Sequence, residues 1–551
     1  MAGRHEQVGT PLAGRTHRWT DPRIAAGAVA LAAIAILIGG AFLGLLAEGA
    51  SDLTGAAAAF DSYLFRIARF TLWQAALSTL LSVVPAIFVA RALSRHPEFP
   101  GRQLILRLFA LPLALPAIVA ALGILALLGR AGFFAETLSG LFGGTWPGIY
   151  GLSGILVAHV FFNLPLATRF FLEALDTLPP DQWRLASQLG MGAGPSFRLI
   201  EWPAIRASLP GTAGLVFMLC IASFTIVLTL GGGPAATTLE VAIYQALRFD
   251  FDPARAVALT LLQVVLTGAV MVGLARLGAA TAIDANLPVA PRRFGRVSPG
   301  EALANGVLVL AALLFVAGPI LAIALAGAQA DLTRLAADIA VRNAAATSVV
   351  LATLAAILSV MLGLSLVAAR QALERQRGGK RQGWLERASG TGAGFVLVIP
   401  PIVIGAGWFV ALRHSDLLFA AAPLMVVTVN AVMAMPFAIR AIRPAYDAAG
   451  ERNDRLCMQL GIAGWTRLRL IDWPELRKPL LTGFAFAMAL SLGDLGVIAL
   501  FGSDSVQTLP YLLLARMGSY RTDDAAGIAL LLAILCLTLI FLAERFGRRP
   551  A

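Results

Sequence analysis

A polar motif that occurs twice, each time between long apolar runs, decides how this chain folds. The first copy is Arg184-Leu185-Ala186-Ser187-Gln188-Leu189-Gly190, followed after nine residues by Ile200-Glu201-Trp202-Pro203. The second copy is Arg455-Leu456-Cys457-Met458-Gln459-Leu460-Gly461, followed after nine residues by Ile471-Asp472-Trp473-Pro474, at a constant offset of 271 residues. Arg198 and Arg206 recur at the same offset as Arg469 and Arg477. This register indicates two similar halves that present the same surface.

The composition around the motif is that of a membrane protein. Of 551 residues, 58% are hydrophobic and 13% charged, and the mean hydropathy is +0.80. Apolar runs close to the ~20 residues that cross a ~30 Å hydrocarbon core number about twelve, near 24–47, 68–91, 105–128, 150–172, 209–231, 256–278, 303–327, 345–369, 391–412, 418–440, 480–502 and 525–544. The runs lack the period-two alternation of a membrane barrel. We therefore expect an all-α polytopic protein with about 12 transmembrane helices.

The net charge of +12 reports topology rather than nucleic-acid binding. If the N-terminus is cytoplasmic, 33 of the 43 Lys and Arg residues fall in cytoplasmic segments. This is the positive-inside pattern. It predicts cytoplasmic N- and C-termini and places both motif copies on the cytoplasmic face.

The repeat extends beyond the motif and defines the domains. Leu164–Arg169 matches Met435–Arg440, and Asp176 matches Asp447, again at offset 271. An even number of crossings separates matching points, so the two six-helix repeats are parallel. We expect an N-terminal tail (1–23), a first repeat (24–280), a cytoplasmic linker (281–300), a second repeat (301–545) and a C-terminal tail (546–551).

Each motif copy is expected to form two short amphipathic helices that meet at an angle. Pro179-Pro180-Asp181 is typical of a helix start, and Trp183, Leu185 and Leu189 are expected on one apolar stripe. Gly190 can end this helix because glycine tolerates left-handed dihedral angles, and Pro203 is expected to stop the second helix before the next span. Such a pair gains stability from a groove on another protein. The alternative is a pair of interfacial helices whose arginines face lipid headgroups.

The spacing of Gly, nine residues and then Ile-x-x-Pro resembles the coupling loop of permease subunits in binding-protein-dependent ABC importers. The resemblance implies a type I ABC importer permease fold, with two fused domains whose coupling loops, 179–206 and 450–477, dock onto an ATPase subunit. The family's leading Glu is replaced by Arg184 and Arg455, and the following Ala by Leu185 and Leu456. The other implied coupling residues are Ala186, Gln188, Leu189, Gly190, Ile200, Pro203, Gln459, Leu460, Gly461, Ile471 and Pro474.

Two further stretches resemble the thiamine permeases of this family. They are Phe161-Phe162-Asn163-Leu164-Pro165-Leu166-Ala167-Thr168-Arg169 and Gly231-Gly232-Gly233-Pro234-Ala235-Ala236-Thr237-Thr238-Leu239-Glu240. The resemblance implies import of thiamine or its phosphates across a bacterial inner membrane, with two copies of an ABC ATPase subunit and a periplasmic thiamine-binding protein as partners. Permeases for ferric iron, polyamines or sulfate remain alternatives.

The chain itself is not expected to be an enzyme, or to hold a cofactor or metal. A phosphate-binding loop needs a lysine followed by Ser or Thr, but Arg follows Lys380 and Pro follows Lys478, the two lysines present. ATP hydrolysis is thus expected in the partner. An ion-coupled secondary transporter is the alternative from another class, although such coupling usually needs several intramembrane acids.

Polar residues inside spans are the candidates for the substrate path, because they are costly in lipid. Asp494, within Leu492-Gly493-Asp494-Leu495-Gly496, is the clearest, since a carboxylate attracts a cation such as thiamine. Ser223 and Thr225 lie at or near the equivalent position of the first half. His159 and Asn430 match at offset 271, with interhelical hydrogen bonding as the alternative role.

Overall fold

A computed structural model describes residues 21–51, 60–276, 298–377, 381–396, 399–415, 417–462, 464–503 and 506–547. Residues 1–20 and 548–551 of the expected tails, and residues 281–297 of the expected linker, lie outside this description. The described residues are helical apart from turns, bends and one isolated bridge between Ser503 and Val506. The expected all-α class is confirmed.

Nine helices of the described chain are long and apolar enough to cross a membrane. They are α1 (Pro22–Ser51), α3 (Ser62–Arg95), α8 (Leu152–Asp176), the run from α10 (Ala193–Ser196) to α11 (Trp202–Ile221), α14 (Pro253–Arg276), α15 (Pro299–Gln329), α17 (Ile339–Arg377), α21 (Ala422–Gln459) and α26 (Thr522–Gly547). A tenth consists of α4 (Arg102–Leu108) and α5 (Leu111–Ala114) with α6 (Ala117–Leu128), bent by 112°. The expected number of about 12 is therefore not reproduced.

The remaining two apolar runs are broken helices, because their sequences interrupt the backbone hydrogen-bond ladder. Pro400 separates α18 (Trp384–Val396) from α19 (Pro401–Leu412), and Asp494 separates α23 (Trp473–Gly493) from α24 (Gly496–Phe501). The first half is broken at the matching places, at Pro116 before α6 and at Ser223 before α12 (Phe224–Leu230). Irregular backbone at membrane depth is tolerated where protein buries it or where it lines a cavity.

The internal repeat is also visible in the packing. Helix α3 packs against α8 and α11, and α17 packs in the same way against α21 and α23. The N–H of Leu239, which begins α13 (Leu239–Arg248), donates to Thr71 Oγ1 at 3.1 Å. The N–H of Leu509, which begins α25 (Leu509–Gly518), donates to Ser348 Oγ at 2.8 Å. The same hydrogen bond between a helix start and a hydroxyl group is therefore present in each half.

The first helix of each half packs against the other half. Helix α1 contacts α17 and α19, while α15 contacts α6 and α3. Glycines permit both crossings: a Cβ on Gly123 would lie 2.3 Å from the carbonyl oxygen of Pro319, and one on Gly407 would lie 2.3 Å from that of Ala41. This exchange ties the halves together through backbone contacts that a larger side chain would prevent.

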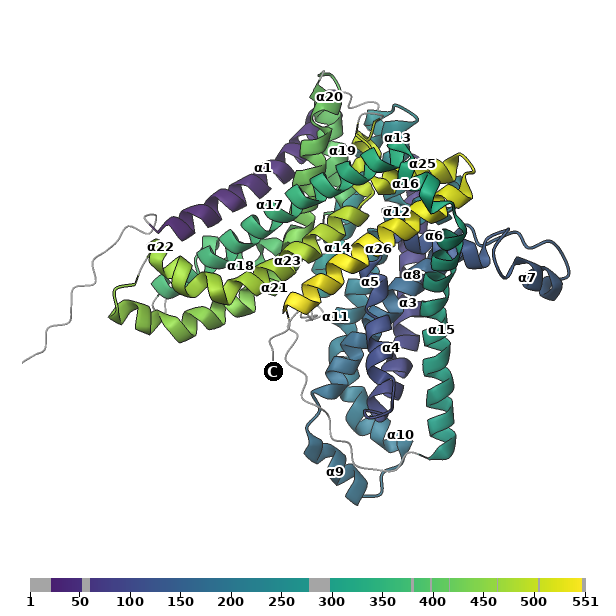
Figure 1. The fold of residues 1–551 in the computed structure, drawn as a ribbon, viewed down its shortest axis with the longest axis horizontal. Coiled ribbons are helices and arrows are strands. Elements are labelled where there is room, and N and C mark those ends of the chain that lie inside the picture. Colours follow the sequence, from purple (N-terminus) through teal and green to yellow (C-terminus); the bar gives the residue numbers. More distant parts are fainter. Residues whose placement is uncertain are drawn as a thin grey trace, which may run out of the picture.

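The halves also meet at one end of the molecule and separate at the other (Figure 1). Helices α13, α25 and α16 (Leu332–Ala337) lie near one another at the upper right, and Arg248 Nη2 donates to the carbonyl of Gly502 at 2.9 Å. Helices α9 (Pro180–Gln188) and α22 (Gly464–Arg467), which belong to the two motif copies, lie at separate corners.

Candidate functional site

The first motif copy forms a helix, a sharp turn and a second helix. Helix α9 begins after Pro179 and carries Asp181 in its first turn, as expected. Gly190 lies in the left-handed region (φ +62°), and the N–H of Met191 donates to the carbonyl of Ala186 at 2.9 Å. These are the features of a Schellman motif, which ends a helix and turns the chain. The predicted role of Gly190 as a turn is confirmed.

The second motif copy makes the same turn at the end of a much longer helix. Gly461 has φ +64°, and the N–H of Ile462 donates to the carbonyl of Cys457 at 2.9 Å. Here the helix before the turn is not separate, because α21 runs without a break from Ala422 to Gln459. The first half differs because Pro179 and Pro180 interrupt the helix, so that α8 and α9 are separate.

Pro203 does not stop a helix, contrary to the sequence-based expectation, and neither does its counterpart Pro474. Each lies in the first turn of a span, α11 or α23, directly after a π-helical turn (Phe197–Glu201 or Leu468–Asp472). The helical run continues from the π turn into the span, so the proline removes one hydrogen-bond donor from inside this run. The wider π turn, in which the N–H of Trp202 donates to the carbonyl of Phe197, relieves the clash of the proline ring with the preceding turn.

Two leucines form the exposed apolar face of each turn. Leu185 and Leu189 are 57% and 67% exposed, and Leu456 and Leu460 are 51% and 62% exposed. Trp183 is instead buried with Ala186, so the expected single stripe with Trp183 is wrong: a two-residue step along a helix turns by ~200° and points to the opposite side. Large apolar side chains held outward at equivalent places are typical of an interaction surface.

The other predicted coupling residues surround these leucines. Gln188 and Gln459 are exposed, Ile200 and Ile471 are half-buried in the π turns, and Pro203 and Pro474 are exposed. Arg184, which replaces the family's acid, is exposed and lies 3.4 Å from Asp181. The side chain of Arg455 lies outside the described residues.

A buried carboxylate clamps the first motif segment to the spans; the segments 179–206 and 450–477 are called the docking segments, after the role that their motifs predict. Glu201 is fully buried, and its two oxygens accept from Arg91 Nε at 2.7 Å and from Arg95 Nε at 3.0 Å, both on α3. The same arginines pair with Glu301 at the start of α15. Ion pairs therefore join the π turn to α3 and, through the same arginines, to α15.

The second docking segment is held by a more open network. Asp472, at the position of Glu201, lies 3.4 Å from Arg467, which also pairs with Asp454 at 2.6 Å, while Arg375 of α17 pairs with Asp454. Burial disfavours the charged Arg467 guanidinium, but the hydrogen bond to Asp454 and the charge of Asp472 outweigh it and raise the pKa of Arg467. Asp454 is thus engaged inside the network rather than offered to a partner.

Two of the candidate substrate-path residues in the first half, His159 and Ser223, are hydrogen-bonded to each other. His159 Nδ1 lies 2.8 Å from Ser78 Oγ, and His159 Nε2 lies 2.7 Å from Ser223 Oγ, at the break between α11 and α12. Asn430 does not occupy the equivalent contact, because its Nδ2 donates to Ser491 Oγ at 3.0 Å. Thr225 is half-buried on α12, and its carbonyl accepts from Thr229.

Asp494 differs from Ser223, its counterpart, in being incompletely satisfied. Its Oδ1 accepts from the N–H of Gly496 at 3.3 Å, and its Oδ2 is buried without a hydrogen-bond partner among the described residues. The neighbouring Gly493 lies against Pro116 of the other half, where a Cβ would come within 3.1 Å. The carboxylate therefore stands at a helix break beside the contact between the halves.

Sequence reasoning missed the clamp of Arg91, Arg95, Glu201 and Glu301. One signal was present, because an acid precedes Trp-Pro in both motif copies, as Glu201 and Asp472. Its arginine partners lie more than 100 residues away on α3, where no local pattern connects them.

The family model described as binding-protein-dependent transport system inner membrane component matches residues 82–281 and again residues 377–549. The thiamine transport system permease protein ThiP of Brucella abortus (strain 2308) is 57% identical over 520 residues, which cover 94% of each chain. The protein of the same name from Escherichia coli (strain K12) is 43% identical over 89% of this chain and 90% of its own. That of Haemophilus influenzae is 37% identical over 94% of this chain and 96% of its own.

Proposed function

The chain belongs to the family of binding-protein-dependent transport system inner membrane components, and we propose that it is the permease subunit of an ATP-driven importer for thiamine or thiamine phosphates. The family is one of multi-pass transport components of the bacterial inner membrane, so the chain is not itself an enzyme. Transport of this kind implies a binding protein and an ATPase. Membership of this family excludes the alternative of an ion-coupled secondary transporter.

The observation that carries the mechanism is the pair of equivalent turns at Gly190 and Gly461, each with two exposed leucines. Two such surfaces fit two copies of an ATPase subunit, one at each docking segment. The same glycine turn and the same spacing in both halves favour docking over the purely interfacial role, which needs an apolar face toward lipid but not an identical turn in each half. The positive-inside pattern supports a cytoplasmic position for this face and for both termini.

Alternating access follows from how the docking segments are attached. When ATP brings two ATPase subunits together, both segments move with them, and the clamp at Glu201 passes the movement to α3 and α15. The halves then rock as rigid bodies about the end where α13 and α25 meet. The substrate, delivered by a periplasmic thiamine-binding protein, passes along the contact between the halves.

Asp494 is the group we assign to the cationic substrate. Its Oδ2 has no partner among the described residues, and it stands beside the inter-half contact of Gly493 with Pro116. An opposite unit charge ~4 Å away is worth up to about 4 kcal/mol at an effective dielectric of ~20. In the first half the corresponding position is Ser223, a neutral hydroxyl that is hydrogen-bonded to His159.

The test is uptake of labelled thiamine by liposomes containing this chain, its ATPase and its binding protein. We expect ATP-dependent accumulation, and a maximal rate at saturating binding protein that falls about tenfold or more in Asp494→Asn. Asparagine keeps the acceptor for the Gly496 N–H, so folding is preserved. Ser223→Ala is the matched control and should stay near the wild-type rate.

Two outcomes would count against different parts of the proposal. Absence of ATP-driven thiamine uptake by the wild-type complex would overturn the substrate assignment. Wild-type rates in Asp494→Asn would remove Asp494 from the path and leave the assignment of thiamine intact.

A further inference from the structure

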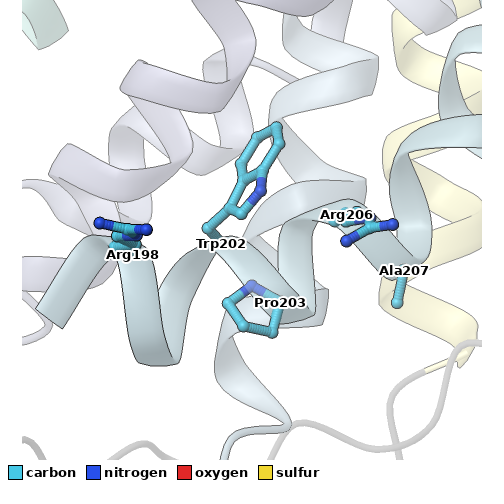
Figure 2. Close-up of a pocket in the computed structure, with 5 residues that line it drawn as sticks. All are labelled: Arg198, Trp202, Pro203, Arg206 and Ala207. Carbon is cyan, nitrogen blue, oxygen red and sulfur yellow. The ribbon is translucent and has the colours of Figure 1, made fainter. Parts of the chain in front are cut away.

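A hollow lies where the first docking segment continues into α11. It is open to the outside of the protein, has a volume of about 500 Å³ and is lined by Arg198, Trp202, Pro203, Arg206 and Ala207. Residues four apart share one face of a helix, and Figure 2 shows Arg198 and Arg206 on either side of Trp202. The hollow is thus bounded by two guanidinium groups with an indole ring between them.

The positive charge of this hollow is not neutralised by the protein. Within the described part of the chain, neither Arg198 nor Arg206 forms an ion pair with a carboxylate. The nearest acid in sequence, Glu201, is fully buried and bound to Arg91 and Arg95. The two arginines are therefore free to bind an anion from outside the chain.

The same three residues recur in the second half at offset 271, as Arg469, Trp473 and Arg477. Trp473 is 57% exposed, and both arginines are exposed without a carboxylate partner among the described residues. The adjacent acid, Asp472, is again turned to an internal partner, Arg467. We call the two sets (198, 202, 206 and 469, 473, 477) the arginine–tryptophan stripes.

The stripes lie at the depth of lipid headgroups. The predicted apolar runs 209–231 and 480–502 begin three residues after Arg206 and Arg477. At ~1.5 Å per residue these two arginines lie about 5 Å from the hydrocarbon core, within the headgroup layer. Tryptophan is enriched at this boundary, and the arginines on each side lie within reach of phosphate groups.

We propose that each stripe binds the phosphodiester headgroup of an anionic phospholipid of the inner leaflet. The two guanidinium groups donate to the phosphate oxygens, and the indole packs against the glycerol region. Each docking segment then has two functions along its length: the leucines at the turn bind protein, and the helix that follows is held at the membrane surface. The lipid would fix the height of each segment against the bilayer while the ATPase moves it.

The experiment counts the lipids that stay bound to the purified permease–ATPase complex in native mass spectrometry. The complex is titrated with phosphatidylglycerol or with phosphatidylcholine of the same acyl chains. We expect two phosphatidylglycerol molecules to be retained in preference to phosphatidylcholine. In the variant with Arg198, Arg206, Arg469 and Arg477 all replaced by Gln, apparent affinity should fall roughly 30-fold at each site, since each arginine near an anionic surface is worth about 1 kcal/mol.

Arg342→Gln with Arg521→Gln is the matched control. Both arginines are exposed and belong to the opposite end of the molecule, close to α16 and α25, so this variant should retain the two lipids.

Three results would overturn the proposal. One is equal retention of the two lipids by the wild-type complex. Another is displacement of the lipid by an equal concentration of inorganic phosphate, which would indicate a site for free anions. The third is unchanged lipid binding in the fourfold variant together with loss of the ATPase, which would assign the stripes to the protein interface. The readout is a lipid count, so its failure is distinct from a failure of thiamine transport.

Discussion

At the scale of single residues, equivalent positions in the two halves have diverged in chemistry while keeping their place. Glu201 and Asp472 both precede Trp-Pro, but Glu201 is fully buried between two arginines, whereas Asp472 lies 3.4 Å from Arg467 in a more open network. Ser223 and Asp494 both mark a helix break, but the serine is hydrogen-bonded to His159 and the carboxylate has one free oxygen. The sequence shows these pairs, but their partners are distant and become visible only in the fold.

We predict that Glu201→Ala costs the protein about 1.5–3 kcal/mol of stability, because two charge-assisted hydrogen bonds are lost and only Glu301 remains to pair with Arg91 and Arg95. The measurement is the thermal unfolding midpoint of the purified protein in detergent. Asp472→Ala is the matched control and should cost less, because Arg467 keeps Asp454 at 2.6 Å. Equal losses in the two variants would contradict the clamp.

At the scale of elements, the turns could be predicted and the helix breaks could not. Gly190 and Gly461 were identifiable because glycine at a fixed place in a repeated motif indicates a left-handed turn, and both have φ near +60°. The breaks at Pro116, Ser223 and Asp494 fall inside runs that remain apolar throughout. Hydropathy measures whether a segment is apolar, not whether its backbone is continuous, and it therefore gave no sign of these breaks.

We expect Gly190→Val with Gly461→Val to abolish association with the ATPase. A Cβ at either place would meet no atom within 4 Å, so the effect comes from backbone conformation: a left-handed residue costs ~1–2 kcal/mol, and more when it is β-branched. The measurement is co-purification of the ATPase with membrane-inserted permease.

The control for this variant is Gly190→Asn with Gly461→Asn, because asparagine adopts left-handed dihedral angles more readily. It should retain most of the ATPase. If the valine variant also retained it, the turns would not be needed for docking.

At the scale of the whole molecule, the two halves are interlocked in a way that periodicity does not predict. The boundaries at 24–280 and 301–545 follow the sequence repeat and stay predictions, whereas in the fold α1 packs on α17 and α19, and α15 packs on α6 and α3. An apolar helix face indicates that another helix will cover it, but it does not indicate which one. The packing of each half's first helix on the other half is therefore visible only in the fold. It places α15 beside the clamp of the opposite half, where it shares Glu301 with Arg91 and Arg95.

The most direct test of the central claim, that both turned segments dock onto ATPase subunits, is cross-linking from one engineered cysteine in each. Gln188 and Gln459 are exposed beside the turns, while the native Cys220, Cys457 and Cys536 are buried. With Gln188→Cys or Gln459→Cys in inverted membrane vesicles, a short bifunctional reagent is expected to capture the ATPase subunit from each site separately, and two copies from the double variant. Capture from neither site, or labelling of these cysteines only from the periplasmic side, would contradict the account.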